Sequence, residues 1–476
     1  MVDANIFRQY DIRGIVPDTF NKDVAQQIAN AFAFQVKSET GNRVPAIAVG
    51  RDARLSSKDI FNGVADGIKD AGCDVVELGV CPTPATYFSS FFMEMDAFIM
   101  ITGSHNPPEY NGIKLGIGHS TYHSEKITSI YEDITRYGYI NADMRGQHRV
   151  DTINKYYIDW NIEHFAPLKD KISSLNRNIN VVIDAGNGVA SHVAPEIFEA
   201  LGVKVTKLYC EPDGNFPNHH PDPTVEDNLS DLKEKIKQRG ADFGVAYDGD
   251  ADRIGIIDEK QDVIWGDLLL LIYAKELKKK YEKPKIIADV KASKVLFDSL
   301  EKIGAEGIMW KTGHSLIKNK LQETGAELAG EMSGHIFFKD EYYGYDDAIY
   351  ASLRFLEAYV NNLSEENIGK VSDLLRDIPE VYNTPEIRFD CPDDKKFEVV
   401  NKLAEKFKNY LKEGKLGIKE IIDIDGIRVV FENGWGLLRA SNTQPVLVMR
   451  FEATDKAEME QYRKIIEKEL KEMMDL

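Results

Sequence analysis

Three aspartates at alternate positions are the strongest chemical signal in this sequence. Asp248, Asp250 and Asp252 stand in the segment Asp-Gly-Asp-Ala-Asp-Arg, between two apolar runs typical of strands. Alternate side chains of an extended chain point the same way, so this spacing predicts three converging carboxylates. Converging carboxylates repel one another unless a cation lies among them, and ligand sets made only of oxygen favour Mg²⁺ or Ca²⁺ over Zn²⁺. We therefore predict a magnesium site, with a solvated acidic turn as the alternative.

An EF-hand calcium loop is the obvious rival interpretation of this segment, because Glu259 occupies its twelfth position. The sixth position, however, is Arg253, where the sharp turn of an EF-hand needs glycine. The flanking runs are strand-like rather than helical, which also disfavours an EF-hand.

A serine follows another apolar run. Ser104 lies in Thr-Gly-Ser-His-Asn-Pro, directly after residues 97–101, where a tight turn would expose its hydroxyl. A Ser-His-Asp hydrolase is one interpretation, but Ser104 and His105 are adjacent, and neighbours in a loop rarely face each other as nucleophile and base. The G-x-S-x-G elbow is also absent. Ordinary turn chemistry at Asn106-Pro107 is the remaining alternative.

A third polar loop could hold phosphate. Residues 439–445, Arg-Ala-Ser-Asn-Thr-Gln-Pro, join two strand-like runs and combine a guanidinium, two hydroxyls and an amide, which suit phosphate oxygens. A polar hairpin without a ligand is the alternative. Gly186 and Gly188 suggest a dinucleotide loop, but Ser191 stands where the third glycine belongs, so we do not predict nucleotide binding.

The elements that must position these loops form a weak repeat. Strand-like runs begin near residues 46, 180 and 285, and each precedes a loop, a helical stretch, a second strand and a third run that ends in a polar loop. Alternating strands and helices predict α/β units with mostly parallel sheets, whose ligands gather beyond the strand carboxyl ends. The last hundred residues break this pattern, with helices near 395–413 and 457–473. We place the domains at 1–149, 150–257, 258–369 and 370–476.

The amino-acid composition disfavours some classes of binding partner. The 476 residues include 78 acidic and 59 basic side chains, a formal net charge of −19. This charge argues against nucleic acid or an anionic membrane as partner. Apolar runs are too short to span a bilayer, and the beginning of the sequence lacks a signal-peptide pattern. Four widely spaced cysteines suggest neither a disulfide framework nor a zinc site. We expect a soluble, cytoplasmic, multidomain protein that is a monomer or weak oligomer.

Taken in order, the loops resemble the α-D-phosphohexomutase family, and within it the phosphomannomutase/phosphoglucomutase branch. The resemblance covers nearly the whole chain and rests on the segments 7–14 (Phe-Arg-Gln-Tyr-Asp-Ile-Arg-Gly), 102–107, 211–217 (Glu-Pro-Asp-Gly-Asn-Phe-Pro), 248–253, 311–315 (Lys-Thr-Gly-His-Ser), 330–335 (Gly-Glu-Met-Ser-Gly-His) and 439–445. It implies an α/β fold with three similar mixed α/β sandwich domains and a smaller α+β C-terminal domain around a central cleft.

The resemblance also implies an activity: the interconversion of hexose 1-phosphate and hexose 6-phosphate of mannose, glucose or both. Ser104 would carry a phosphoryl group, pass it to the sugar and recover one from a hexose 1,6-bisphosphate intermediate, which also serves as activator. Its phosphate would share one Mg²⁺ with Asp248, Asp250 and Asp252. Lys114 and His335 match positions proposed for proton transfer, with phosphate positioning as the alternative role.

Substrate contacts follow from the same resemblance. Glu331 and Ser333 would contact sugar hydroxyls. The non-reacting phosphate would be clamped by Arg439, Ser441, Asn442 and Thr443. Tyr10, Arg13, Arg253, Lys291 and His314 are further cleft residues. A phosphoglucosamine mutase of the same family, a phosphatase and a non-catalytic divalent-metal-binding module are the alternatives that remain open.

Overall fold

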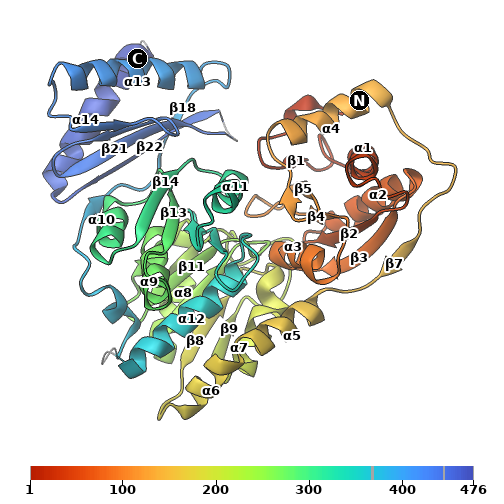
Figure 1. The fold of residues 1–476 in the computed structure, drawn as a ribbon, viewed down its shortest axis with the longest axis horizontal. Coiled ribbons are helices and arrows are strands. Elements are labelled where there is room, and N and C mark those ends of the chain that lie inside the picture. Colours follow the sequence, from red (N-terminus) through yellow and green to blue (C-terminus); the bar gives the residue numbers. More distant parts are fainter. Residues whose placement is uncertain (1, 366–368, 443–444, 475–476) are drawn as a thin grey trace.

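A computed structural model describes residues 2–365, 369–442 and 445–474. Within these residues the strands form four sheets, each covered by its own helices. Figure 1 shows the first unit, coloured red to orange, on one side of the molecule and the fourth, in blue, at another end. The second and third units lie between them, in yellow, green and cyan.

The first three units share one strand topology. In each unit a central strand lies between two parallel neighbours. The central strands are β2 (Ala46–Arg51), β8 (Asn180–Asp184) and β13 (Lys285–Asp289). A fourth strand pairs antiparallel with whichever of the two neighbours comes later in the sequence. The link to that antiparallel strand carries the serine loop in the first unit, the aspartate loop in the second and Glu331–His335 in the third. The predicted repeat is therefore confirmed, and its three polar loops are topologically equivalent.

The remaining elements of the first unit are β1 (Ile12–Ile15), β3 (Asp74–Val80), β4 (Ala97–Ile101), β5 (Tyr110–Ile117), β6 (Ser120–Thr121), β7 (His148–Val150), α1 (Lys22–Thr40), α2 (Ser57–Asp70), α3 (Thr83–Phe92) and α4 (Glu125–Tyr137). The second unit adds β9 (Lys204–Leu208), β10 (Phe243–Tyr247), β11 (Ile254–Asp258), β12 (Val263–Ile264), α5 (Asn154–His164), α6 (Ala166–Ser174), α7 (Ala194–Ala200) and α8 (Ser230–Arg239).

The third unit contains β14 (Glu306–Trp310), β15 (Leu328–Gly330), β16 (Ile336–Phe338), α9 (Gly266–Lys280), α10 (Lys294–Lys302), α11 (His314–Thr324) and α12 (Ala348–Glu365). The fourth contains β17 (Tyr382–Asn383), β18 (Ile387–Asp390), β19 (Glu420–Ile422), β20 (Ile427–Val430), β21 (Gly434–Ala440), β22 (Val446–Ala453), α13 (Lys396–Lys412) and α14 (Lys456–Met473). All its strand pairs are antiparallel. This architecture confirms the predicted fold class; the domain boundaries at 149/150, 257/258 and 369/370 stay predictions.

Burial explains why these runs form central strands. Every residue of β4 (Ala-Phe-Ile-Met-Ile) and of β10 (Phe-Gly-Val-Ala-Tyr) is buried, as expected for strands covered by helices on both faces. One large hydrophobic cluster contains residues of the first three units, whereas the fourth unit has a core of its own under α13 and α14. The first three units thus form a common scaffold against which the fourth is separately packed.

No helix in the described ranges has both the length and the apolar character needed to cross a membrane.

Candidate active site

The serine loop connects β4 to β5 and places Ser104 in an unusual backbone conformation. Ser104 has φ of 49°, in the left-handed region that non-glycine residues rarely adopt, and it is 3% exposed. Its backbone N–H donates to Thr102 Oγ1 at 2.8 Å. Its own hydroxyl donates to Asp248 Oδ2, 2.9 Å away on the second unit. The predicted nucleophile and the predicted metal loop are therefore in direct contact.

One contact in this loop was not predicted. His105 does approach its neighbour, with Nδ1 lying 3.2 Å from Ser104 Oγ. The left-handed turn at Ser104 brings the two side chains to the same side of the loop. Burial lowers the pKa of His105 well below its usual value, and the charges of Arg253 and Arg13 lower it further, so the imidazole is neutral at physiological pH.

The aspartate loop is a tight turn rather than the extended segment that its spacing suggested. Asp248 Oδ1 accepts the backbone N–H groups of Asp252 at 3.0 Å and Arg253 at 3.1 Å, and Ala251 has φ of 62°. These bonds fold the chain back on itself. The carboxylates of Asp248, Asp250 and Asp252 still converge, since one oxygen from each lies within 4.8 Å of the others. The convergence was predicted correctly, but for the wrong geometric reason.

This carboxylate trio has the character of a divalent-cation site. Oδ1 of Asp250 is buried without a hydrogen-bond partner among the residues that the structure describes. Burial raises the pKa of Asp248 well above its usual value, and the neighbouring charges of Asp252 and Asp250 raise it further. Three fully buried carboxylates that offer only oxygen ligands suit a hard cation such as Mg²⁺.

Lys114 supplies positive charge beside the trio. From β5 its Nζ lies 2.7 Å from Asp250 Oδ2 and 2.5 Å from Asp252 Oδ2. Burial lowers the pKa of Lys114, but the charges of Asp250 and Asp252 outweigh it and raise the pKa well above its usual value. The ammonium is therefore charged, and it can hold a proton or attract an anion next to Ser104.

His335 links the trio to the third unit. Its Nε2 lies 3.2 Å from Asp252 Oδ1, and its Nδ1 lies 2.7 Å from Glu331 Oε2. Burial lowers the pKa of His335, but Asp252 and Glu331 raise it to about 9 in spite of the opposing charge of Arg253. A protonated imidazole can bond both carboxylates at once. Burial raises the pKa of Glu331, yet His335 lowers it to about 2, so its carboxylate is ionised.

The contacts continue from Glu331 to the fourth unit. Glu331 Oε1 accepts the N–H of Gly313 at 2.6 Å, and the hydroxyl of Tyr10 donates to the neighbouring carbonyl of Thr312 at 2.9 Å. Asn442 in turn donates from Nδ2 to the Tyr10 hydroxyl at 2.7 Å. A continuous series of contacts thus joins Ser104 of the first unit to the 439–445 loop of the fourth.

Other predicted residues surround this series. Arg253 Nε lies 3.3 Å from His335 Nε2, and Ser333 Oγ lies 3.4 Å from His335 Nδ1. Lys291 Nζ pairs with Glu386 Oε1 at 2.8 Å, and its charge also acts on Glu331.

The rest are placed as follows. His314 packs edge-on against Tyr10, and Arg13 of β1 pairs with Asp11, which precedes the strand. Ser441 is buried at the end of β21. Thr443 lies outside the described residues.

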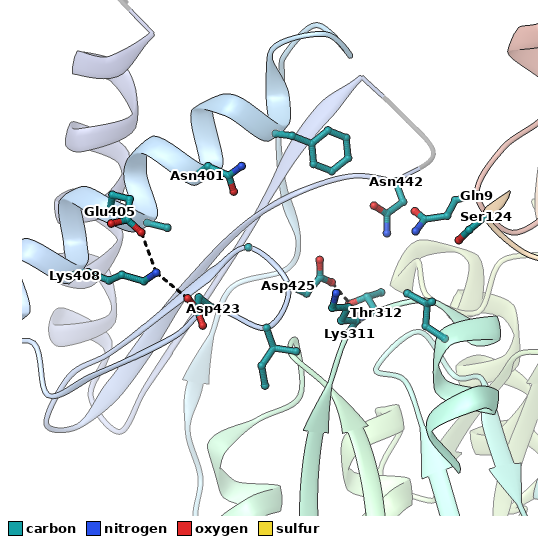
Figure 2. Close-up of a pocket in the computed structure, with 15 residues that line it drawn as sticks. Gln9, Ser124, Lys311, Thr312, Asn401, Glu405, Lys408, Asp423, Asp425 and Asn442 are labelled. Carbon is teal, nitrogen blue, oxygen red and sulfur yellow. Dashed lines mark hydrogen bonds and ion pairs between the residues drawn. The ribbon is translucent and has the colours of Figure 1, made fainter. Parts of the chain in front are cut away.

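A cavity of about 610 Å³ opens where the first, third and fourth units meet. Figure 2 shows Asn442, Gln9 and Ser124 on one side of it, with Lys311 and Thr312 below and α13 above. The expectation of a cleft between the units is therefore met at the 439–445 loop. The cavity's lining combines amides and hydroxyls with two lysines, Lys311 and Lys408, and three carboxylates, Glu405, Asp423 and Asp425.

Three supporting residues escaped prediction from the sequence. Thr83 donates to Asp250 Oδ2 at 2.6 Å, Asp346 pairs with His314 and Lys318, and Asp425 accepts from Arg439. None of the three lies in a recognisable motif, so no local spacing pointed to them. Arg54 stands beside polar turn residues in the sequence, which makes it one of several candidate cations, and in the structure it bonds the serine loop.

Comparison with known proteins agrees with this geometry along the whole chain. Residues 4–139, 159–261 and 265–382 match phosphoglucomutase/phosphomannomutase alpha/beta/alpha domains I, II and III, and residues 386–469 match the C-terminal domain. A phosphomannomutase/phosphoglucomutase of Pseudomonas aeruginosa is 41% identical over 469 residues, covering 98% of this chain and 96% of that protein. A phosphoglucomutase of Neisseria gonorrhoeae is 40% identical over 460 residues, covering 96% and 95%.

Solved structures point the same way. The crystal structure of a phosphoglucomutase/phosphomannomutase family protein from Burkholderia thailandensis superimposes with a TM-score of 0.88 at 38% identity, covering 100% of this chain and 98% of that one. The predicted resemblance is confirmed by both kinds of comparison: the chain belongs to the phosphoglucomutase/phosphomannomutase family of mutases.

Proposed function

We propose that this protein is a phosphohexomutase that interconverts the 1-phosphate and 6-phosphate of mannose, glucose or both. The main observation behind the proposal is the 2.9 Å hydrogen bond from Ser104 Oγ to Asp248. This bond places the serine hydroxyl next to the three buried carboxylates. The names of the relatives support the substrate class, since proteins 40 to 41% identical to this chain are called phosphomannomutase/phosphoglucomutase or phosphoglucomutase.

In the proposed reaction, Ser104 in its phosphorylated form gives its phosphoryl group to a sugar hydroxyl. The bond from phosphorus to Ser104 Oγ breaks, a bond from phosphorus to the sugar oxygen forms, the sugar hydroxyl loses its proton and the leaving Ser104 Oγ gains one. The resulting hexose 1,6-bisphosphate turns over in the cleft and returns its other phosphoryl group to Ser104 Oγ. Lys114 and His335 are our candidates for the groups that transfer this proton, and their positive charge also suits positioning of the phosphate.

Asp248, Asp250 and Asp252 are the proposed ligands of Mg²⁺, together with the phosphate on Ser104. A phosphoserine adds nearly two negative charges to this trio, so a divalent cation is needed to neutralise the site and polarise the phosphoryl group. Hexose 1,6-bisphosphate is the proposed activator, because it can restore the phosphoryl group on Ser104.

One pocket must accept the sugar in two orientations. We propose that Glu331 and Ser333 bind the hydroxyls that glucose and mannose share, while Arg439, Ser441, Asn442 and Thr443 hold the phosphate that does not react. The ionised state of Glu331 supports its role as an acceptor. Tyr10, Arg13, Arg253, Lys291 and His314 complete the proposed set. We further propose that the enzyme acts in the cytoplasm as a monomer or weak oligomer.

The test is an assay of purified protein with Mg²⁺ and a trace of the 1,6-bisphosphate. Its substrates are the 1-phosphates of glucose, mannose, glucosamine and N-acetylglucosamine. We expect conversion of the glucose or mannose substrate, and loss of nearly all turnover in Ser104→Ala but not in the exposed control Ser120→Ala. Faster conversion of an aminosugar would favour a phosphoglucosamine mutase. Release of free phosphate faster than isomerisation would favour a phosphatase, and metal binding without phosphorylated Ser104 would favour a non-catalytic module.

A further inference from the structure

Arg54 is a buried guanidinium that bonds the serine loop almost entirely through backbone carbonyls. Its side chain is fully buried, although it lies only three residues beyond the central strand β2. Nη2 donates to the carbonyl of Ser104 at 2.7 Å and to that of Asn106 at 2.6 Å. Nη1 donates to the carbonyls of Pro107 at 2.6 Å and Tyr110 at 3.0 Å. One side chain thus binds four carbonyls over the seven-residue stretch that contains the proposed nucleophile.

Asp52 completes this arrangement from the other side. Its Oδ2 accepts from Arg54 Nε at 3.0 Å, from Thr102 Oγ1 at 2.9 Å and from the N–H of Gly103 at 3.2 Å. The Arg54–Asp52 pair therefore contacts the loop on both sides of Ser104. A loop held this way can keep a residue in the left-handed region, because the hydrogen bonds offset the backbone strain.

The second unit covers the guanidinium with an aromatic ring. Phe216 lies with its ring centroid 5.1 Å from the Arg54 guanidinium carbon, within the range of cation–π attraction. Phe216 itself has φ of 49°, a strained conformation for an aromatic residue. A Cβ on nearby Gly214 would lie 2.6 Å from the carbonyl oxygen of Ala53, so only glycine lets the 211–217 turn approach this closely. The segment Glu-Pro-Asp-Gly-Asn-Phe-Pro therefore has a structural role that is separate from substrate binding: it packs Phe216 against Arg54.

We propose that Arg54, held between the serine loop and Phe216, is a positioning residue that sets the distance between Ser104 and the aspartate trio. Phe216 belongs to the same unit as Asp248, so the ring anchors the loop of the first unit to the unit that carries the carboxylates. A lysine would keep the charge but could not serve four carbonyls and a carboxylate with one planar fork. This inference rests on the proposed function, because it assigns a role relative to Ser104 as nucleophile.

The experiment compares Arg54→Lys and Phe216→Leu with the wild-type enzyme and with Arg354→Lys. Arg354 is a matched control: it is also a buried arginine that bonds a carbonyl and a carboxylate, both of Asp340, and faces an aromatic ring, Phe338, but away from the serine loop. Four quantities are measured for each protein: kcat, KM, the melting temperature, and the rate at which Ser104 is phosphorylated by glucose 1,6-bisphosphate, followed by intact mass.

We expect Arg54→Lys to lower kcat and the phosphorylation rate about 100-fold, the cost of misplacing a reacting group by about 1 Å. KM should stay within about twofold, since Arg54 bonds the loop and not the proposed substrate contacts. Phe216→Leu should lower kcat in the same way but less, and Phe216→Tyr, which keeps the ring, should restore it. Arg354→Lys should lower the melting temperature while leaving kcat and the phosphorylation rate unchanged.

The outcomes separate this inference from the proposed function. If the wild-type protein isomerises hexose phosphates through phosphorylated Ser104 but both Arg54→Lys and Phe216→Leu keep wild-type kcat, the positioning role is overturned while the function stands. An equal loss of kcat in Arg354→Lys would also overturn it, because the effect would then be general destabilisation. If Arg54→Lys does not fold, Phe216→Leu alone decides. A wild-type protein without phosphorylated Ser104 overturns both proposals.

Discussion

Asp425 and Arg439 form an ion pair at the cavity, with Arg439 Nε donating to Asp425 Oδ2 at 3.0 Å. The same carboxylate oxygen accepts the backbone N–H of Thr312 from the third unit at 3.1 Å. One carboxylate of the fourth unit therefore orients the guanidinium that we propose for phosphate binding, and ties it to the third unit. Among the described residues no hydrogen bond engages the other two guanidinium nitrogens of Arg439, so they can bind an anion.

Removing this carboxylate should weaken substrate binding more than catalysis. In Asp425→Ala the guanidinium loses its oriented partner, so we expect KM for hexose phosphate to rise about fivefold, equivalent to ~1 kcal/mol, with kcat changed little. Steady-state kinetics give both values. Asp423→Ala is the control, because Asp423 lies in the same turn but pairs with Lys408 of α13. A KM of Asp425→Ala equal to that of the control would show that Arg439 does not depend on Asp425.

Divalent metal should be required for activity and should stabilise the protein. Burial and the charges of Asp252 and Asp250 raise the pKa of Asp248, and Oδ1 of Asp250 has no hydrogen-bond partner within the described part of the chain. A chelator should therefore abolish turnover and Mg²⁺ should restore it. At 100 times its Kd the metal should add about 2.7 kcal/mol to the free energy of unfolding, measurable as a rise in melting temperature.

The matched variants are Asp250→Asn, which removes the negative charge of a proposed ligand, and Asp262→Asn, which changes an exposed aspartate close by in sequence. We expect the first to lose the metal-induced rise in melting temperature and the second to keep it. An undiminished rise in Asp250→Asn would exclude Asp250 as a ligand.

The loops of this site could be predicted because each follows a strand with a recognisable pattern. Runs such as residues 97–101 and 243–247 are apolar throughout, and the polar residues directly after them stand at the carboxyl ends of buried strands. Three occurrences of the same order predicted three equivalent units. The convergence of the aspartates needed only local spacing, although the turn that brings it about, with Ala251 in a left-handed conformation, was not foreseen.

Contacts between units could not be predicted in this way. Thr83 meets Asp250 across 167 residues, and Asp425 meets Thr312 across 113. Such pairs depend on how separate sheets pack against each other. The periodic patterns of a single sequence report on individual helices and strands and do not show this packing. The approach of His105 to Ser104 was missed for a different reason, since it depends on a strained φ that ordinary turn preferences disfavour.

Acid should weaken the contact between the third and fourth units at Glu386. The charge of Lys291, 2.8 Å away, lowers the pKa of Glu386 from 4.5 to about 2. A carboxyl group whose folded-state pKa is lowered stabilises the protein above its unfolded pKa, and the stabilisation disappears as the pH falls through the folded value. Glu386→Gln should therefore lower the melting temperature at neutral pH, and the difference from wild type should shrink as the pH falls from 4.5 toward about 2.

Thermal melts of both proteins across this range measure the effect. Glu398→Gln is the control, since Glu398 pairs with Lys402 on an exposed face of α13 and should change the melting temperature little at any pH. A difference between wild type and Glu386→Gln that grows on acidification would contradict the assigned ion pair.

Gly188 should be sensitive to the addition of a single methyl group, because it supports the aspartate loop. A Cβ at this position would lie 2.8 Å from the carbonyl oxygen of Gly249, and that carbonyl also accepts the N–H of Val189 at 3.2 Å. The backbone φ of Gly188, −84°, is one that alanine adopts, so any effect comes from crowding alone. The Gly-Asn-Gly segment thus serves as a support for the aspartate loop instead of the nucleotide loop that its pattern resembles.

We expect Gly188→Ala to destabilise the protein by ~1–3 kcal/mol, the usual cost of overpacking, and to raise the Mg²⁺ concentration needed for half-maximal activity. Gly369→Ala is the matched control, since a Cβ there would meet nothing within 4 Å. Metal titrations of activity, run beside thermal melts, separate the two effects. Lower stability with an unchanged metal requirement would mean that Gly249 can move without displacing Asp248 and Asp250. The metal ligands would then be positioned by their own hydrogen bonds and not by the contact with Gly188.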